Sequence, residues 1–161
     1  MEQVDWNNIL GWNEEQKQDI RACGYSYIRQ GKYDIAIQFF KVLILLKRST
    51  ITDLRTLGAL FLETGEFDQA VNYLNYARAR DDSDIATRLN FAKALLRSGK
   101  TDDGLKLAQN LTSSTDALIS RRAQALILAF SWIGSEFKPF ILRHSAAIHF
   151  NNLNHCRMQI K

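Results

Sequence analysis

Apolar residues recur along the chain at spacings of three and four, in pairs of segments that are separated by short polar turns. The first pair carries Ile20, Cys23, Gly24, Tyr27 and Ile28, followed by Ala36, Ile37, Phe40 and Leu43. The second pair carries Leu54, Leu57, Gly58, Phe61 and Leu62, followed by Ala70, Val71, Leu74 and Ala77. This spacing places the apolar side chains on one face of a helix. The pattern therefore predicts consecutive helical hairpins.

The hairpins repeat with a period of 34 residues. Gly31, Gly65 and Gly99 are separated by that interval, and glycine at a helix end readily adopts the positive φ of a turn. Small residues recur in the same register at positions 24, 58 and 92, and again at positions 36, 70 and 104. We expect the two helices of each hairpin to cross at these positions, because only small side chains allow a close approach.

The periodic residues resemble the tetratricopeptide repeat. Its pattern of a large residue, Leu-Gly, an aromatic, Gly, an aromatic, Ala, an aromatic and Ala is matched well by the first two copies and loosely by the third, which has Arg88, Phe91-Ala92, Leu95, Gly99, Thr101, Gly104, Ala108 and Leu111. The resemblance implies an all-α fold, a right-handed superhelix of three helix hairpins with an N-terminal helix and C-terminal capping helices.

We therefore expect a single domain, 1–161, with repeats at 17–50, 51–84 and 85–118. Residues 1–16 are predicted to form an N-terminal helix, whose apolar residues Trp6, Ile9 and Leu10 either mediate a homodimer or pack on the first repeat. Asn13 and Gln16 read as the capped start of the first repeat helix. A helix from about Ala117 to Trp132 is predicted to cover the last repeat through Leu118, Ala125, Leu126 and Phe130. We assign 119–138 as the capping helix, and 139–161 form a tail with only partial helical periodicity.

Composition agrees with one globular helical unit, since 46% of the residues are hydrophobic and only 8 are Gly and 1 is Pro. The longest apolar stretch without a charge, 42–46, is far shorter than the roughly 20 residues of a membrane span. The start of the chain has no secretory signal and the two cysteines make no disulfide framework, so we expect a cytoplasmic protein. The net charge of +4 comes from basic residues interleaved with acids, which does not favour nucleic-acid binding.

No catalytic, metal or cofactor site is predicted, and we expect no enzyme. His144, His149, His155 and Cys156 lack the spacing of a zinc site. Cys23 stands where the repeat has a buried Leu and is interpreted as a core residue. The acidic run 81–84 lacks the Gly and Glu of a calcium loop and is interpreted as a solvated loop in which Ser83 or Asp84 caps the next helix.

The remaining candidate site is a surface. In stacked helical hairpins the first helix of each pair lines the concave side. The residues predicted to face a ligand there form a basic groove with apolar patches: Arg21, Tyr25, Ile28, Arg29, Arg55, Ala59, Leu62, Leu89, Asn90, Lys93, Leu96 and Arg97. Apolar anchors and hydrogen-bonding Arg or Asn side chains suit an extended peptide, so we expect a protein or peptide client.

Within the tetratricopeptide proteins, the chain resembles the type III secretion translocator chaperones of the SycD/LcrH kind. The resemblance rests on Gly31-Lys32-Tyr33-Asp34 leading to 39–43, and on Leu57-Gly58-Ala59 followed by Gly65, Ala70 and Tyr76. It implies a bacterial cytoplasmic chaperone that holds a hydrophobic translocator, and a homodimer formed through the N-terminal helix. The alternative is a scaffold or assembly subunit of a secretion or pilus apparatus.

Overall fold

The computed structural model describes residues 11, 13–46 and 49–134, and all regular structure in this part of the chain is helical. The predicted N-terminal contacts of Trp6, Ile9 and Leu10 lie outside the described residues, as do the tail 139–161 and its histidines. No helix in the described ranges is long and apolar enough to cross a membrane.

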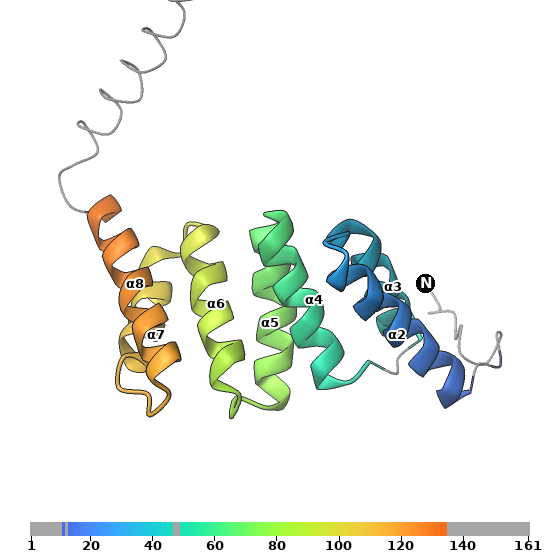
Figure 1. Ribbon diagram of the computed structural model, residues 1–161. Coiled ribbons are helices and arrows are strands. Elements are labelled where there is room, and N and C mark those ends of the chain that lie inside the picture. Colours follow the sequence, from blue (N-terminus) through green and yellow to red (C-terminus); the bar gives the residue numbers. More distant parts are fainter. Residues whose placement is uncertain (1–10, 12, 47–48, 135–161) are drawn as a thin grey trace, which may run out of the picture.

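The hairpins stand side by side in a row, from α2 and α3 at one end to α7 and α8 at the other (Figure 1). Each helix contacts the next one along the chain. Their bounds are α2 Glu14–Arg29, α3 Tyr33–Leu45, α4 Ile51–Thr64, α5 Phe67–Arg80, α6 Ile85–Arg97, α7 Thr101–Leu111 and α8 Ala117–Gly134. This all-helical arrangement of hairpins confirms the predicted fold class.

The first helix of each hairpin begins with a side-chain cap. Asn13 accepts a hydrogen bond from the backbone N–H of Gln16 at 2.9 Å, and the Gln16 side chain accepts one in return from the N–H of Asn13. Thr50 and Asp53 form the same reciprocal box at the start of α4, and Asp84 accepts from the N–H of Thr87 at the start of α6. Such caps satisfy backbone donors that have no partner within the helix, and they confirm the predicted starts at Asn13 and Asp84.

The turn within each hairpin repeats in the same register. Gly31, Gly65 and Gly99 have φ of 70°, 84° and 86°, which confirms the expected positive φ. One residue later, the backbone N–H bonds a carbonyl five residues back in every repeat: Lys32 to Tyr27 at 3.0 Å, Glu66 to Phe61 at 2.9 Å and Lys100 to Leu95 at 2.9 Å. This closure of the helix end fixes where the second helix starts.

The two helices of a hairpin cross at the predicted small residues. A Cβ added to Gly24 would lie 2.9 Å from Cε2 of Phe40, and one added to Gly58 would lie 2.5 Å from Cγ of Leu74. Ala36, Ala70 and Ala92 have no exposed surface. The large side chains of the core, including Phe40, Phe61, Leu57 and Leu74, pack around these crossings.

Two expectations about buried faces are wrong. Cys23 is exposed, whereas Leu57, its counterpart one repeat later, is fully buried, because α4 has the preceding hairpin against it and α2 is the first helix in the described ranges. In α8, Ile119 and Ala123 are buried and Leu126 packs beside them, while Leu118 and Ala125 are exposed. The predicted burial is thus wrong for Leu118 and Ala125, whereas Leu126 packs as expected and Phe130 is half-buried.

We expect Gly58→Ala to destabilise the protein by about 1–3 kcal/mol, because the new methyl group would overlap Leu74. Helix propensity alone predicts the opposite sign, a gain of roughly 1 kcal/mol. Urea unfolding followed by circular dichroism distinguishes the two, and a stabilised Gly58→Ala variant would contradict the close approach. In the double variant with Leu74→Ala, the cost of adding the methyl group should largely disappear.

Candidate functional site

The predicted binding residues lie on α2, α4 and α6, and we call the surface that these helices form the first-helix face. The helices are brought together directly, since α4 contacts α6, Arg21 of α2 contacts Asp53 of α4, and Tyr25 of α2 contacts Thr56 of α4. The structure thus places residues from all three repeats on one continuous surface.

Arg21 joins the first repeat to the second. Its Nε lies 3.0 Å from Oδ1 and 3.1 Å from Oδ2 of Asp53, and Nη2 lies 3.1 Å from Oδ2. The Asp53 side chain is 1% exposed and also accepts from the backbone N–H of Thr50 at 2.8 Å. The hydrogen bonds from Arg21 to Asp53 raise the pKa of the guanidinium. Arg21 therefore compensates a buried carboxylate at the start of α4.

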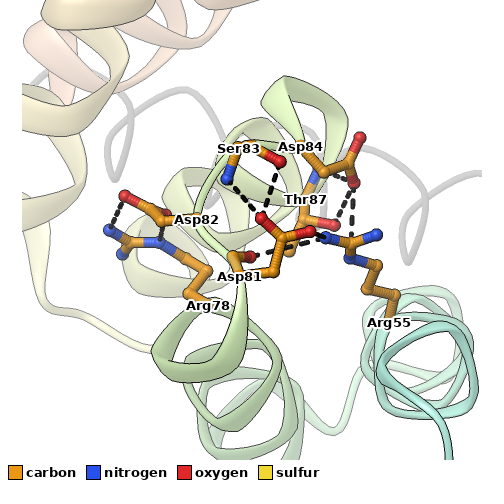
Figure 2. Close-up of polar contacts among 7 residues, drawn as sticks. All are labelled: Arg55, Arg78, Asp81, Asp82, Ser83, Asp84 and Thr87. Atoms are coloured by element: carbon orange, nitrogen blue, oxygen red, sulfur yellow. Dashed lines mark hydrogen bonds and ion pairs between the residues drawn. The ribbon is translucent and has the colours of Figure 1, made fainter.

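Arg55 makes the equivalent joint one repeat later. Figure 2 shows its guanidinium directed at the loop between α5 and α6, where Nη2 donates to Oδ2 of Asp81 at 2.7 Å and Nε lies 3.6 Å from Oδ2 of Asp84. The Asp84 carboxylate also accepts from the N–H and the hydroxyl of Thr87 at the start of α6. Arg55 is thus held by the cap of the next repeat, as Arg21 is.

The second oxygen of Asp81 and the carboxylate of Asp82 also accept hydrogen bonds in this loop (Figure 2). Oδ1 of Asp81 accepts from the Ser83 hydroxyl at 2.6 Å and from its N–H at 2.9 Å. These bonds, followed by the one from Arg55, lower the pKa of Asp81 to about 2. Hydrogen bonding to Arg78 lowers the pKa of Asp82. The acidic run therefore has a structural role in joining α4, α5 and α6.

The apolar patches expected in the groove are largely absent from the surface. Leu62, Leu89 and Leu96 are 6%, 6% and 3% exposed. The prediction that these leucines face a ligand in the groove is therefore wrong. Leu62 belongs to the main core cluster, Leu89 packs with Ile119 of α8, and Leu96 packs against α7 at Gly104. Their side chains fill the interfaces between helices, where burial stabilises them more than exposure would.

Mostly polar side chains remain on the first-helix face. Tyr25 is half-buried. Its ring packs edge-on against the ring of Phe40, with 5.3 Å between the centroids, and its hydroxyl lies 3.3 Å from that of Thr56. Ile28, Ala59, Asn90 and Lys93 are half-buried, and Arg29 and Arg97 are exposed. The Nζ of Lys93 lies 3.4 Å from the carboxylate of Glu63. This set offers hydrogen-bond donors to an extended backbone, and its accessible apolar surface is confined to small patches.

Sequence reasoning missed a hollow of about 620 Å³ on the opposite side, between α3 and α5. We call it the outer groove. Ile44, Leu54 and Tyr73 form its apolar part, and exposed residues of α5 line it at Gln69, Asn72, Tyr76 and Arg80. The one signal in the sequence was a pair of tyrosines, at 73 and 76, beside the apolar stripe of the second helix.

We expect Arg21→Ala to lower the free energy of unfolding by about 3 kcal/mol, because it leaves the buried carboxylate of Asp53 without its cation. Arg29→Ala, on the exposed side of the same helix, is the matched control and should change stability by less than about 0.5 kcal/mol. Urea unfolding measures both variants. Equal stability of the two variants would mean that the joint contributes nothing.

The lowered pKa of Asp81 predicts a pH-dependent contribution to stability. An ionised Asp81 stabilises the folded chain above the ordinary carboxyl pKa, and this stabilisation is lost as the pH falls toward about 2. Asp81→Asn should therefore destabilise the protein more at pH 7 than at pH 3. Ser83→Ala should show the same trend in urea unfolding; an effect equal at both pH values would contradict the assignment.

Comparisons with known proteins agree with this geometry. The tetratricopeptide repeat sequence model matches residues 61–127, and no curated protein sequence matches the chain. Among solved structures, PcrH in complex with the chaperone binding region of PopD is 24% identical, with a TM-score of 0.64 over 78% of this chain and 98% of that one.

Two further structures are each 21% identical to the chain. PcrH from Pseudomonas aeruginosa has a TM-score of 0.61 over 74% of this chain and 95% of that one. The type III secretion translocator chaperone SycD from Yersinia enterocolitica has a TM-score of 0.60 over 78% of this chain and 98% of that one. The protein thus has the tetratricopeptide-repeat fold, and that fold resembles the translocator chaperones PcrH and SycD.

Proposed function

We propose that this protein is a cytoplasmic chaperone for type III secretion substrates, which holds an extended or amphipathic segment of its client on the first-helix face. The observation that carries the proposal is the likeness in fold to PcrH, whose solved structures include complexes with the chaperone binding regions of PopB and PopD. The continuous surface formed by α2, α4 and α6 supports it.

The roles of the individual residues follow from their contacts. Arg21 and Arg55 are engaged in the joints between repeats, so they position the helices. Asn90, Lys93, Arg29 and Arg97 are accessible, and their donors suit the carbonyl groups or acidic side chains of an extended segment. The small side chain of Ala59 leaves room for the client backbone to approach α4.

Binding of this kind requires only differential affinity, without turnover or a cofactor. A chaperone that binds the unassembled client stabilises that state by mass action and covers its apolar segment. The client's binding energy must therefore come from backbone hydrogen bonds and from small apolar contacts near Ile28 and Tyr25, because the leucines of the face are buried. A homodimer through the N-terminal segment is a further part of the proposal.

The identity of the partner tests the proposal. Affinity purification from the native host at moderate salt, followed by mass spectrometry of the intact complexes, should recover one hydrophobic secreted protein in stoichiometric amount. Addition of the segment of that protein that binds the chaperone should displace it. Recovery of permanent apparatus components that never exchange would favour the scaffold alternative instead.

We expect the double variant Asn90→Ala with Lys93→Ala to bind the recovered client at least about tenfold more weakly, because it removes two accessible donors of the face. Asn75→Ala with Lys106→Ala is the matched control, since both residues are exposed on α5 and α7. Fluorescence anisotropy with the labelled client segment gives the affinities. Equal affinity of the two double variants would place the client elsewhere.

A further inference from the structure

The outer groove has an apolar part beside an exposed polar rim. Leu54 is buried, and the ring of Tyr73 is half-buried and stacks on Phe61 with 5.4 Å between the centroids. Tyr76, in contrast, is 65% exposed. A large, exposed aromatic side chain beside an apolar hollow is a common feature of protein interaction sites.

The groove residues of α5 form one stripe along the helix. Gln69, Asn72 or Tyr73, Tyr76 and Arg80 follow one another at intervals of three or four residues, so they lie on one face. From the first to the last the stripe is roughly 16 Å long, since a helix rises 1.5 Å per residue. That length matches about five residues of extended chain.

The equivalent hollow one repeat later shows that stacking alone does not produce a groove of this size and lining. It lies between α5 and α7 and has a volume of about 340 Å³. Arg78, which occupies the register position of Ile44, places its guanidinium 4.6 Å from the Phe91 ring and binds Asp82. There Asn110 stands in place of Tyr76 and Asp103 in place of Gln69. The second hollow is thus narrowed by Arg78 and carries charges of both signs, at Asp103 and Lys106.

The described lining of the outer groove is basic. Arg80 is the only charged side chain among its described lining residues, and none of the ion pairs between described residues involves it. Arg80 is the last residue of α5, and its guanidinium can bind a carboxylate through two parallel hydrogen bonds. The side-chain amides of Gln69 and Asn72 can pair with the backbone of an extended chain, which an apolar helix face cannot do.

We propose that the outer groove binds an extended segment of a second protein, in which an aliphatic or aromatic side chain lies next to a carboxylate. The apolar side chain packs between Tyr73 and Tyr76, the carboxylate pairs with Arg80, and Asn72 bonds the backbone between them. Because this surface is separate from the first-helix face, the protein can hold two partners at once.

Panning of a phage-displayed library of random dodecapeptides on the full-length protein tests this proposal. The recovered peptides should share an apolar residue beside Asp or Glu, and fluorescence anisotropy gives their affinities. Tyr76→Ala and Arg80→Glu should each weaken binding by about tenfold or more. Asn110→Ala, at the position of Tyr76 in the second hollow, is the matched control and should leave the affinity unchanged.

A charge swap makes the test specific for the carboxylate. A recovered peptide with its acid replaced by Lys should lose affinity for the natural chain and regain it on Arg80→Glu. The proposal is overturned if the peptides lack an acid, or if Tyr76→Ala leaves their binding unchanged. Peptides that depend on Asn90 and Lys93 instead would support the first-helix face and would equally overturn this inference. Since Tyr76 and Arg80 are exposed, circular dichroism should confirm that their variants remain folded.

Discussion

The close approach of two helices within each hairpin is the constraint on which the rest of the structure depends. At Gly58 the second helix comes so near that a single methyl group would meet Leu74, and the same crossing at Gly24 brings in Phe40. Side chains that would separate the helices are therefore excluded at these positions. The crossings set the distance between the two helices of each hairpin, and so the separation of the two surfaces described above.

The joints between hairpins explain why the first-helix face is less basic and less apolar than its sequence indicates. Two of its arginines neutralise carboxylates at the starts of the next helices, and its leucines fill the spaces between helices. What remains for a partner is a set of amide, ammonium, guanidinium and hydroxyl groups. Such a surface binds through directional hydrogen bonds, which favours recognition of an extended main chain over capture of a large apolar surface.

The fold was predictable because its signals are local. The turn glycines and the caps at Asn13 and Asp84 each depend on residues within a few positions of one another, and the 34-residue period repeats these local signals along the chain. The burial of Leu89 and the pairing of Arg21 depend on residues about 30 positions away. The apolar spacing within one helix could therefore not show them. The outer groove was missed for the same reason, since it exists only where α3, α4 and α5 meet.

The joints also differ in kind along the row of hairpins. The first two are ionic, whereas at the third the corresponding position holds Leu89, which packs on α8. Cooling weakens apolar burial, while salt screens the half-exposed pair of Arg55 more than the buried carboxylate of Asp53. The middle joint is consequently the one most sensitive to salt, and the joint to α8 is the one most sensitive to cooling.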